Sequence, residues 1–292
     1  MVMLADLMRR LQFPEEAVTA LQQDYKSLLT LTESKPLLQQ AVEHMVFGKG
    51  THFHDIAKEL AEKSGLAVST VELLIQLRAA EPLKGIYKGK GYAEKLYWDT
   101  MMDLQYKLKE CYEVYGIWGT VAAEWQSGFF RCKMFQLGRL QYEPIGLPIE
   151  EYKGYKQGDT VYNLHIPSSG PMTEESVMAS LKTAYEFFRL QLNDGILPVH
   201  LHSWLIYPPH YAVYPEGGNL RKFYDLFDVF EPVERPKNPY LWRIFGVEKC
   251  EDYSTLPDRT SLQRRFKEYL LSGKCMGAGR GMLLFDGEKI LH

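Results

Sequence analysis

The feature that most constrains the fold is a change in hydrophobic periodicity near Gly116. Before it, apolar residues recur at three- and four-residue spacing, which is typical of amphipathic helices. These helical segments are residues 15–31, 36–47, 54–64, 68–80 and 92–115. After it, aromatic-rich and alternating runs typical of strands are interleaved with helical segments. We therefore expect an α+β protein, with a mainly helical domain over residues 1–115 and a mixed domain over residues 116–292.

The second domain is predicted to contain strands separated by helices. Strands are expected over residues 129–137, 140–142, 161–166, 199–207, 240–247 and 281–285, and helices over residues 173–192, 219–230 and 261–271. Alternation along the strand 161–166 places its side chains on two faces. These are Tyr162, Leu164 and Ile166 on one face, and Val161, Asn163 and His165 on the other.

Composition and charge exclude several classes of protein. A hydrophobic content of 46% and an aromatic content of 13% supply a buried core and argue against disorder. The formal net charge of −3 lacks the basic excess of a nucleic-acid binder. No apolar run is long enough to span a bilayer, and the four scattered cysteines fit a reducing compartment. We expect a cytoplasmic protein without a membrane or nucleic-acid partner, and the sequence does not predict its oligomeric state.

Residues 56–71 resemble a helix-turn-helix. Ala61 occupies the position where two helices cross closely, and Gly65 permits a left-handed turn. A DNA-reading helix, however, presents donors such as Arg, Lys, Asn or Gln to base edges. The candidate helix starting at Val68 has none in its first two turns and carries Glu72. A plain helical corner is therefore favoured over a DNA-binding regulator.

The pair His52 and His54 forms an H-x-H pattern, which could bind a metal if it lay on a strand. Here the pair directly precedes a predicted helix, and Asp55 is a suitable N-cap for that helix. A structural role is favoured.

Two patterns in the second domain have competing interpretations. His200 and His202 share a strand face and could bind zinc together with His165, but no carboxylate or cysteine completes the set. We expect no metal site. Residues 277–281, GAGRG, are as glycine-rich as a phosphate loop, but they precede a strand instead of a helix. A hairpin turn is favoured there.

The segment 165–176, HIPSSGPMTEES, passes from a strand into a helix. Thr173 is a good N-cap, and Glu174 and Glu175 suit the positive end of the helix dipole. Met172 can pack against Val177 as a hydrophobic staple. The helix start is therefore explained without a ligand.

The same segment could also bind an anion. Free N–H groups at a helix N-terminus bind pyrophosphate when small residues let it approach. The small residues here are Ser168, Ser169 and Gly170. The two glutamates of the first turn oppose an anion unless they point outward. Both interpretations remain open from local sequence.

Four stretches of the second half resemble the GNAT-like C-terminal domain of a bacterial acyltransferase family. They are FQLGRLQYE (residues 135–143), LHSWL followed by YP (residues 201–208), NLRKF (residues 219–223) and GRGMLLF (residues 279–285). The helical half is similar to the N-terminal domain of that family. The resemblance implies transfer of an acyl group from acetyl-CoA or another acyl-CoA to an unknown amine. It also implies a mixed sheet flanked by helices, in which the pantetheine arm of CoA enters between two parallel strands that splay apart.

The resemblance implies roles for particular residues. By element order, the pantetheine and pyrophosphate would be bound by Leu164, Ile166, Ser168, Ser169, Gly170, Thr173 and Asn219. Glu143 and His165 are candidates for the base that deprotonates the amine, and Tyr224 is the candidate acid for the departing thiolate. In structural interpretations of the same residues, Glu143 pairs with Arg139, His165 caps a turn and Tyr224 is a packing residue.

The loop before the helix departs from the superfamily pattern. That pattern reads Q/R-x-x-G-x-G/A, whereas residues 167–172, PSSGPM, have one glycine, no Arg or Gln, and prolines that lack an N–H. Two functions therefore follow. One is an N-acyltransferase whose helical domain helps to form the acceptor site. The other is a catalytically inactive GNAT-fold protein that binds a ligand or regulates a partner.

Overall fold

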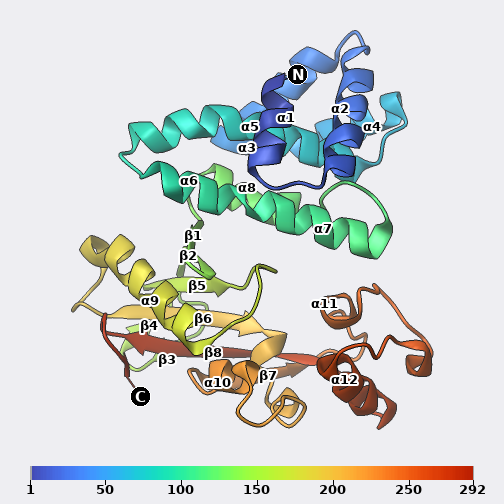
Figure 1. Ribbon diagram of the computed structural model, residues 1–292. Coiled ribbons are helices and arrows are strands. Elements are labelled where there is room, and N and C mark those ends of the chain that lie inside the picture. Colours follow the sequence, from blue (N-terminus) through green and yellow to red (C-terminus); the bar gives the residue numbers. More distant parts are fainter. Residues whose placement is uncertain (1, 292) are drawn as a thin grey trace. The chain divides into compact units, whose positions relative to one another are not determined.

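The computed structural model describes residues 2–291 and contains two compact units (Figure 1). The first unit ends at Gln136 and the second begins at Leu137. Helices build the first unit, and a mixed sheet with flanking helices builds the second. The predicted α+β class is confirmed.

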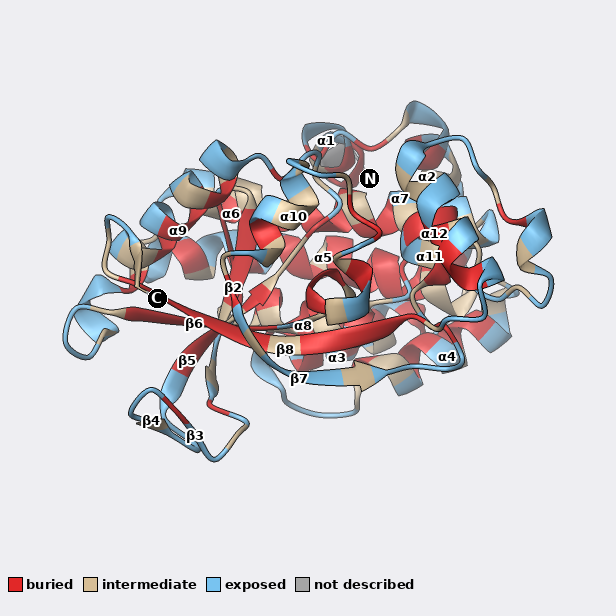
Figure 2. Ribbon diagram, turned by 90° about the horizontal axis from the view of Figure 1, so that it is seen from below, coloured by how far each residue is buried: buried red, intermediate tan, exposed pale blue. Residues whose placement is uncertain are grey.

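The helical unit is organised around one central helix. Its helices are α1 (Val2–Arg10), α2 (Glu15–Leu29), α3 (Ser34–Phe47), α4 (Phe53–Ser64), α5 (Val68–Gly89), α6 (Glu94–Met101), α7 (Asp103–Tyr115) and α8 (Ala123–Phe130). In α5, every residue from 70 to 77 is buried, so more than two turns are enclosed on all sides (Figure 2).

The corner between α4 and α5 has the geometry expected of a helical turn. Gly65 ends α4 with φ of +75°, a value that glycine adopts without strain. The helix that follows, however, is the buried α5. A recognition helix must present its first turns to a DNA groove. Because those turns of α5 are packed inside the unit, the corner is a structural feature.

A seven-stranded mixed sheet and a small hairpin follow the helices, and the boundary between the two units falls within β1, the first strand of this sheet. The strands are β1 (Phe135–Leu137), β2 (Leu140–Gly146), β3 (Glu151–Tyr152), β4 (Tyr155–Lys156), β5 (Thr160–His165), β6 (Leu197–Ser203), β7 (Asp228–Glu234), β8 (Gly277–Phe285) and β9 (Ile290–Leu291). The helices of the second unit are α9 (Glu174–Phe188), α10 (Asn219–Tyr224), α11 (Leu241–Phe245) and α12 (Ser261–Leu271). The sheet order is β1-β2-β5-β6-β8-β7, with β9 beside β8, while β3 and β4 form the hairpin.

Each face of the sheet has its own cover. On one face lies α9, where the ring of Phe188 packs 4.3 Å from that of Tyr162. On the other face, Tyr152 of the hairpin packs into a cluster with Val161 and Met282. Burial follows from this arrangement: β8 is buried along its length, whereas β7 is an exposed edge (Figure 2).

Several predicted boundaries are wrong. Residues 123–130 form α8, so the strand predicted over residues 129–137 is reduced to β1. The strand predicted over residues 240–247 is helix α11. The helix predicted over residues 219–230 ends at Tyr224, and β7 follows from Asp228. The main helix ends at Phe188, before a short 3-10 turn, so Leu192 lies outside it.

The glycine-rich residues 277–281 are not a hairpin turn but the first half of β8. Because the glycines among them have no side chain, the segment that follows β6 can pack directly on the main chain of β8. A Cβ at Gly279 would lie 2.1 Å from the carbonyl oxygen of Ile206, and one at Gly277 would lie 2.5 Å from the ring of Tyr207. The glycines therefore serve close packing of the chain that follows β6.

Within residues 2–291, no helix has both the length and the apolar character that crossing a membrane requires. Cys111, Cys132, Cys250 and Cys275 are all free thiols.

Candidate functional site

The strands β5 and β6 run parallel but pair over a short distance. Their ladder joins Tyr162 to Val199 and Asn163 to His200. By contrast, β6 pairs with β8 along its whole length, as far as Ser203. Beyond the pair Asn163–His200, the described ladder between β5 and β6 has no further rung. Beyond this pair, a main-chain group of one strand that points towards the other must find its partner elsewhere.

A row of polar side chains crosses the sheet where this ladder stops. Glu143 of β2 lies opposite Asn163 of β5, and its Oε2 is 3.1 Å from Nε2 of His165. Nδ2 of Asn163 is also 3.1 Å from Nε2 of His165, and its Oδ1 is 2.9 Å from Nδ1 of His200. The row therefore reads Glu143–His165–Asn163–His200. Asn163 and His165 lie on the same face of β5 as Val161, a member of the apolar cluster under the hairpin.

The two ends of the row differ in exposure. The side chains of Glu143 and His165 keep 30% and 20% of their accessible surface, so a substrate can reach them. His200 is only 3% exposed. Burial, with the nearby charge of Arg280, lowers the pKa of His200 to about 4, so the ring is neutral at pH 7. The row thus joins an accessible carboxylate–imidazole pair to a buried neutral imidazole.

The loop between β5 and α9 is held by Arg139. Its guanidinium donates to the carbonyl oxygens of Pro167 at 3.0 Å, Gly170 at 2.8 Å and Pro171 at 3.3 Å. Thr173 caps α9 as predicted, because its hydroxyl accepts the N–H of Ser176 at 3.2 Å. The suggested pairing of Glu143 with Arg139 is not formed: Glu143 binds His165, and Arg139 binds the loop.

The negative charge in the first turn of α9 repels an anion less than the sequence indicates. Glu174 and Glu175 are exposed, and Glu174 is bound by Lys222 of α10 at 3.1 Å. A hollow of about 200 Å³ lies between the start of α9 and α10. Its lining includes Met172, Val177 and Asn219. In the loop, the hydroxyl oxygen of Ser169 is buried without a hydrogen-bond partner among the described residues.

Of the other predicted co-substrate residues, Leu164 is buried on β5, and Ile166 follows the end of that strand. Ser168 and Gly170 are exposed in the loop. All these residues lie along one path, from the end of the short ladder through the loop to α9.

Tyr224 is placed apart from the polar row. Its ring lies 5.0 Å from that of Tyr211, and it is next to Asp225. Burial, with the charge of Asp225, raises its pKa. Among the described residues, none of these contacts links Tyr224 to Glu143 or His165.

The histidines considered as metal ligands have other partners. His52, not Asp55, caps α4, because its Nδ1 accepts the N–H of His54 at 3.3 Å. Nδ1 of His54 lies 2.6 Å from Glu72, and Nε2 of His52 lies 3.2 Å from Glu124. Within the described part of the chain, no three His, Cys, Asp or Glu side chains gather as a metal site would require.

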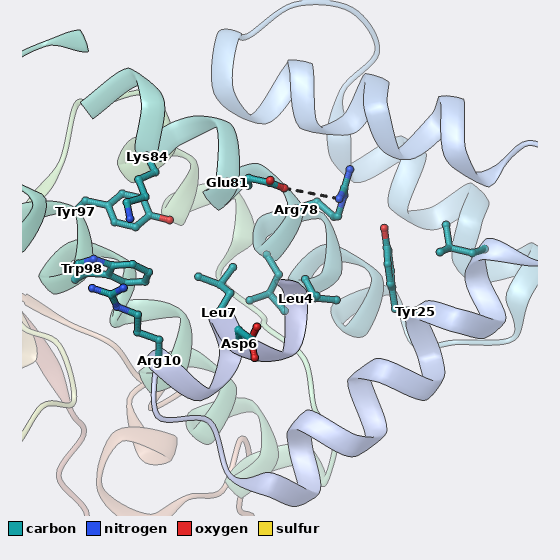
Figure 3. Close-up of a pocket in the computed structure, with 12 residues that line it drawn as sticks. Leu4, Asp6, Leu7, Arg10, Tyr25, Arg78, Glu81, Lys84, Tyr97 and Trp98 are labelled. Carbon is teal, nitrogen blue, oxygen red and sulfur yellow. Dashed lines mark ion pairs between the residues drawn. The ribbon is translucent and has the colours of Figure 1, made fainter. Parts of the chain in front are cut away.

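The helical unit has a cavity of its own, of about 450 Å³ (Figure 3). Leu4 and Leu7 of α1 form part of its apolar wall, and Trp98 stands at one end. The guanidinium of Arg10 lies 3.7 Å from the centre of the Trp98 ring. None of the residues predicted for catalysis or co-substrate binding lines this cavity. All of them lie in the second unit, so the candidate site is placed there.

Three residues of the site were missed. Asn163 shares the predicted face of His165, so strand alternation could have identified it. His200 was considered only as a metal ligand, and its contact with Asn163 depends on the parallel register. Arg139 reaches the loop from the turn between β1 and β2, and no local pattern links the two.

Comparison with known proteins identifies the family. A family profile described as the GNAT-like C-terminal domain matches residues 134–283, and one described as the N-acyltransferase N-terminal domain matches residues 3–132. The chain therefore belongs to the family of acyltransferases that combines these two domains, as the sequence resemblance predicted. A comparison with curated proteins gives no match.

Solved structures share the fold. A crystal structure of an acyltransferase mutant with octanoyl-CoA has a TM-score of 0.74 at 21% identity, covering 95% of this chain and 86% of that chain. An acyltransferase with decanoyl-CoA and teicoplanin has the same TM-score and coverage at 20% identity. The predicted GNAT-like fold is therefore confirmed.

Proposed function

We propose that the protein transfers an acyl group from an acyl-CoA to the amine of an acceptor. The observation that carries this proposal is the position of the Glu143–His165 pair. It lies at the end of β5, where the ladder between β5 and β6 stops. An acyl group carried between these strands would be delivered beside a proton acceptor.

The residues of the row can take the proton that the reaction releases. An amine is an ammonium ion at neutral pH and must lose a proton before it can attack a carbonyl carbon. His165 accepts this proton, and Glu143 stabilises the resulting imidazolium. The amine nitrogen then forms a C–N bond as the C–S bond breaks, and the thiolate takes up a proton. Tyr224 remains the proposed donor for the thiolate, although it lies on α10 away from the row.

The co-substrate site is proposed along the path from Leu164 to α9. Leu164 and Ile166 would contact the pantetheine arm through their main chains. The pyrophosphate would lie against Ser168, Ser169, Gly170 and the capped start of α9 at Thr173, with Asn219 across the hollow. Lys222 supports this assignment, because it neutralises Glu174 at the point where an anion would approach.

The acceptor and the acyl chain are open parts of the proposal. The similar structures hold octanoyl-CoA or decanoyl-CoA, and one of them also holds teicoplanin. We therefore propose medium acyl chains and large amine acceptors as the first to test. The cytosol is the proposed compartment, which the four free thiols support.

Calorimetric titration with acetyl-, octanoyl- and decanoyl-CoA tests the proposal, followed by mass-spectrometric detection of acyl transfer to a panel of amines. We expect binding of at least one acyl-CoA, and turnover that falls about 100-fold in Glu143→Gln and in His165→Gln. Glu186→Gln, an exposed change near the C-terminal end of α9, is the matched control and should retain activity. Absence of binding to every acyl-CoA would overturn the proposal.

The same measurements separate the alternatives. Tight binding without turnover of any amine would favour a catalytically inactive ligand-binding or regulatory protein. Tyr224→Phe tests the acid: a fall in the rate constant kcat at unchanged acyl-CoA affinity would support it, and unchanged kcat would exclude it.

A further inference from the structure

A second group of polar side chains lies on the sheet beyond the row that ends at His200. Arg280 of β8 lies opposite His202 of β6 and opposite Glu231 of β7. Residues that lie directly opposite each other on paired strands share a face, so these three point to the same side of the sheet. His202 follows His200 by two positions on β6, so this is also the side of the polar row.

The protein uses only part of the Arg280 guanidinium. Its Nη1 donates to Oε2 of Glu231 at 2.8 Å, and its side chain keeps 25% of its accessible surface. Within residues 2–291, no second acceptor lies at hydrogen-bond distance from this group. A guanidinium has five N–H donors, so most of them remain unused. Because Nε is enclosed, a ligand can reach the terminal nitrogens.

The charge around His202 is positive. Partial burial lowers the pKa of His202, and the charges of Arg280 and Arg235 lower it further, whereas Glu231 acts in the opposite direction. The N–H of Arg235 bonds to the carbonyl of Met276, so strand pairing continues past β7 and Arg235 stays on the face of Glu231. Its side chain is exposed and has no ion-pair partner in the described part of the chain. Two arginines against one glutamate leave one positive charge.

The polar row gives the same face a negative end. Glu143 is accessible and binds His165, while His200 at the other end of the row is neutral at pH 7. An amine acceptor is an ammonium ion until it loses its proton. The end at Glu143 therefore suits the amine of an acceptor, and the end at Arg280 suits an anionic group of the same molecule.

We propose that Arg280, with Arg235 and His202 beside it, binds a carboxylate group of the acceptor and so selects amines that carry such a group. This inference rests on the proposed function, because it takes the amine to lie at His165. A carboxylate carries one negative charge, which matches the surplus charge here, and arginine binds it through charge-assisted hydrogen bonds. A phosphate, with a charge of about −1.5 to −2, matches less well.

The sheet order sets the spacing of the two groups. Strand β6 separates β5, which carries His165, from β8, which carries Arg280. Two strand spacings of about 4.8 Å amount to roughly 10 Å. The acceptor must therefore hold its amine and its carboxylate roughly 10 Å apart.

Triglycine and its C-terminal amide form a matched pair of acceptors for the test. Three extended residues span about 10 Å, so the amine can lie at His165 while the carboxylate reaches Arg280. The amide has the same length without the charge. With acetyl-, octanoyl- or decanoyl-CoA as donor, we expect a KM for triglycine about tenfold below that for the amide. Equal KM values for the two acceptors would overturn the proposal.

Variants locate the effect at the arginines. Arg280→Gln should raise the KM for triglycine about tenfold and leave kcat and the KM for the amide nearly unchanged, because the carboxylate is bound equally before and during the reaction. Arg235→Gln, a change of an exposed side chain, should raise the KM for triglycine roughly two- to fivefold. Arg189→Gln changes an exposed arginine just after α9 and serves as control. Misfolding would affect both acceptors alike, so an unchanged ratio of their KM values in Arg280→Gln and Arg235→Gln would contradict the proposal.

NMR of protein labelled with ¹⁵N-arginine measures binding without turnover. The Nε–H of Arg280 is assigned as the signal that disappears in Arg280→Gln. Triglycine should shift this signal, with or without acyl-CoA, and the amide should not. Absence of a shift with triglycine, or an equal shift with the amide, would refute the carboxylate site.

The two experiments separate this inference from the proposed function. A shift of the Arg280 signal by triglycine alone supports the carboxylate site even if no acyl group is transferred. Turnover of triglycine and its amide with equal KM values removes the carboxylate site and leaves the acyltransferase function standing.

Discussion

At the scale of single residues, the proposed chemistry depends on residues whose neighbours come from distant parts of the sequence. Glu143 and His165 meet because β2 and β5 pair in one antiparallel register. A shift of that register by one residue would move the side chains of one strand to the opposite face. The residue types were predictable, but the register that brings them together was not.

Gly279 gives a residue-scale prediction about stability. A methyl group at this position would lie 2.1 Å from the main-chain oxygen of Ile206, which cannot move without displacing the segment after β6. Gly279→Ala should lower the free energy of unfolding by roughly 3 kcal/mol, measured by urea denaturation.

Gly85→Ala is the control for that change. Gly85 lies in α5, and a Cβ at this position would meet no atom within 4 Å outside its own helix backbone and chain neighbours. Replacement by alanine there should raise the free energy of unfolding by roughly 0.5–1 kcal/mol, because helix propensity improves without a clash. Equal effects of the two substitutions would show that β8 tolerates a side chain at Gly279.

At the scale of elements, local signals predicted helix starts better than they distinguished helix from strand. The cap at Thr173 was predictable because it depends only on the residues that follow it. The last two residues of α8 were predicted to begin a strand because Phe129 and Phe130 are aromatic. Its helical state brings Gln126 within hydrogen-bond distance of Gln76 and Asp103, and these contacts come from distant parts of the chain. The helix and strand propensities of individual residues do not include tertiary contacts of this kind, so they could not predict α8.

The loop before α9 gives an element-scale prediction. Arg139 holds three carbonyl groups of this loop, so it fixes the start of the helix where the co-substrate phosphates are proposed to bind. Arg139→Ala should raise the Kd for CoA about tenfold, which titration calorimetry can measure. Arg189→Ala removes an exposed arginine just after α9 and serves as control. An unchanged Kd in Arg139→Ala would show that the order of this loop does not matter for binding.

At the scale of the whole molecule, buried histidines make stability depend on pH. His200 and His210 have pKa values of about 4 in the folded chain, below the ordinary value of 6.5. At a pH between about 4 and 6.5, these two histidines bind protons in the unfolded chain but not in the folded chain. The free energy of unfolding is therefore highest above pH 6.5 and falls as the pH drops towards 4. Each histidine should contribute a loss of about 1.5 kcal/mol between about pH 6.5 and pH 5.

Urea denaturation of wild type and His210→Phe at both pH values tests this expectation. The ring of His210 lies among Tyr207, Phe266 and Tyr269, so phenylalanine suits the site. The variant should lose roughly half of the pH dependence that the two histidines contribute. A variant with the full wild-type slope would show that His210 does not remain neutral in the folded protein.

The short ladder between β5 and β6 also bears on aggregation. A sheet normally has two edges, and exposed edges invite strands from other chains. This sheet also has unpaired stretches in its interior, because the described ladder between β5 and β6 ends at Asn163 and His200. Neighbouring strands normally lie about 4.8 Å apart. To admit a further strand between them, β5 and β6 would have to separate to roughly 10 Å within a few residues of the last paired position. A thin, unbranched molecule would meet no such barrier, so the proposed binding of the pantetheine arm between these strands demands less separation than the addition of another polypeptide.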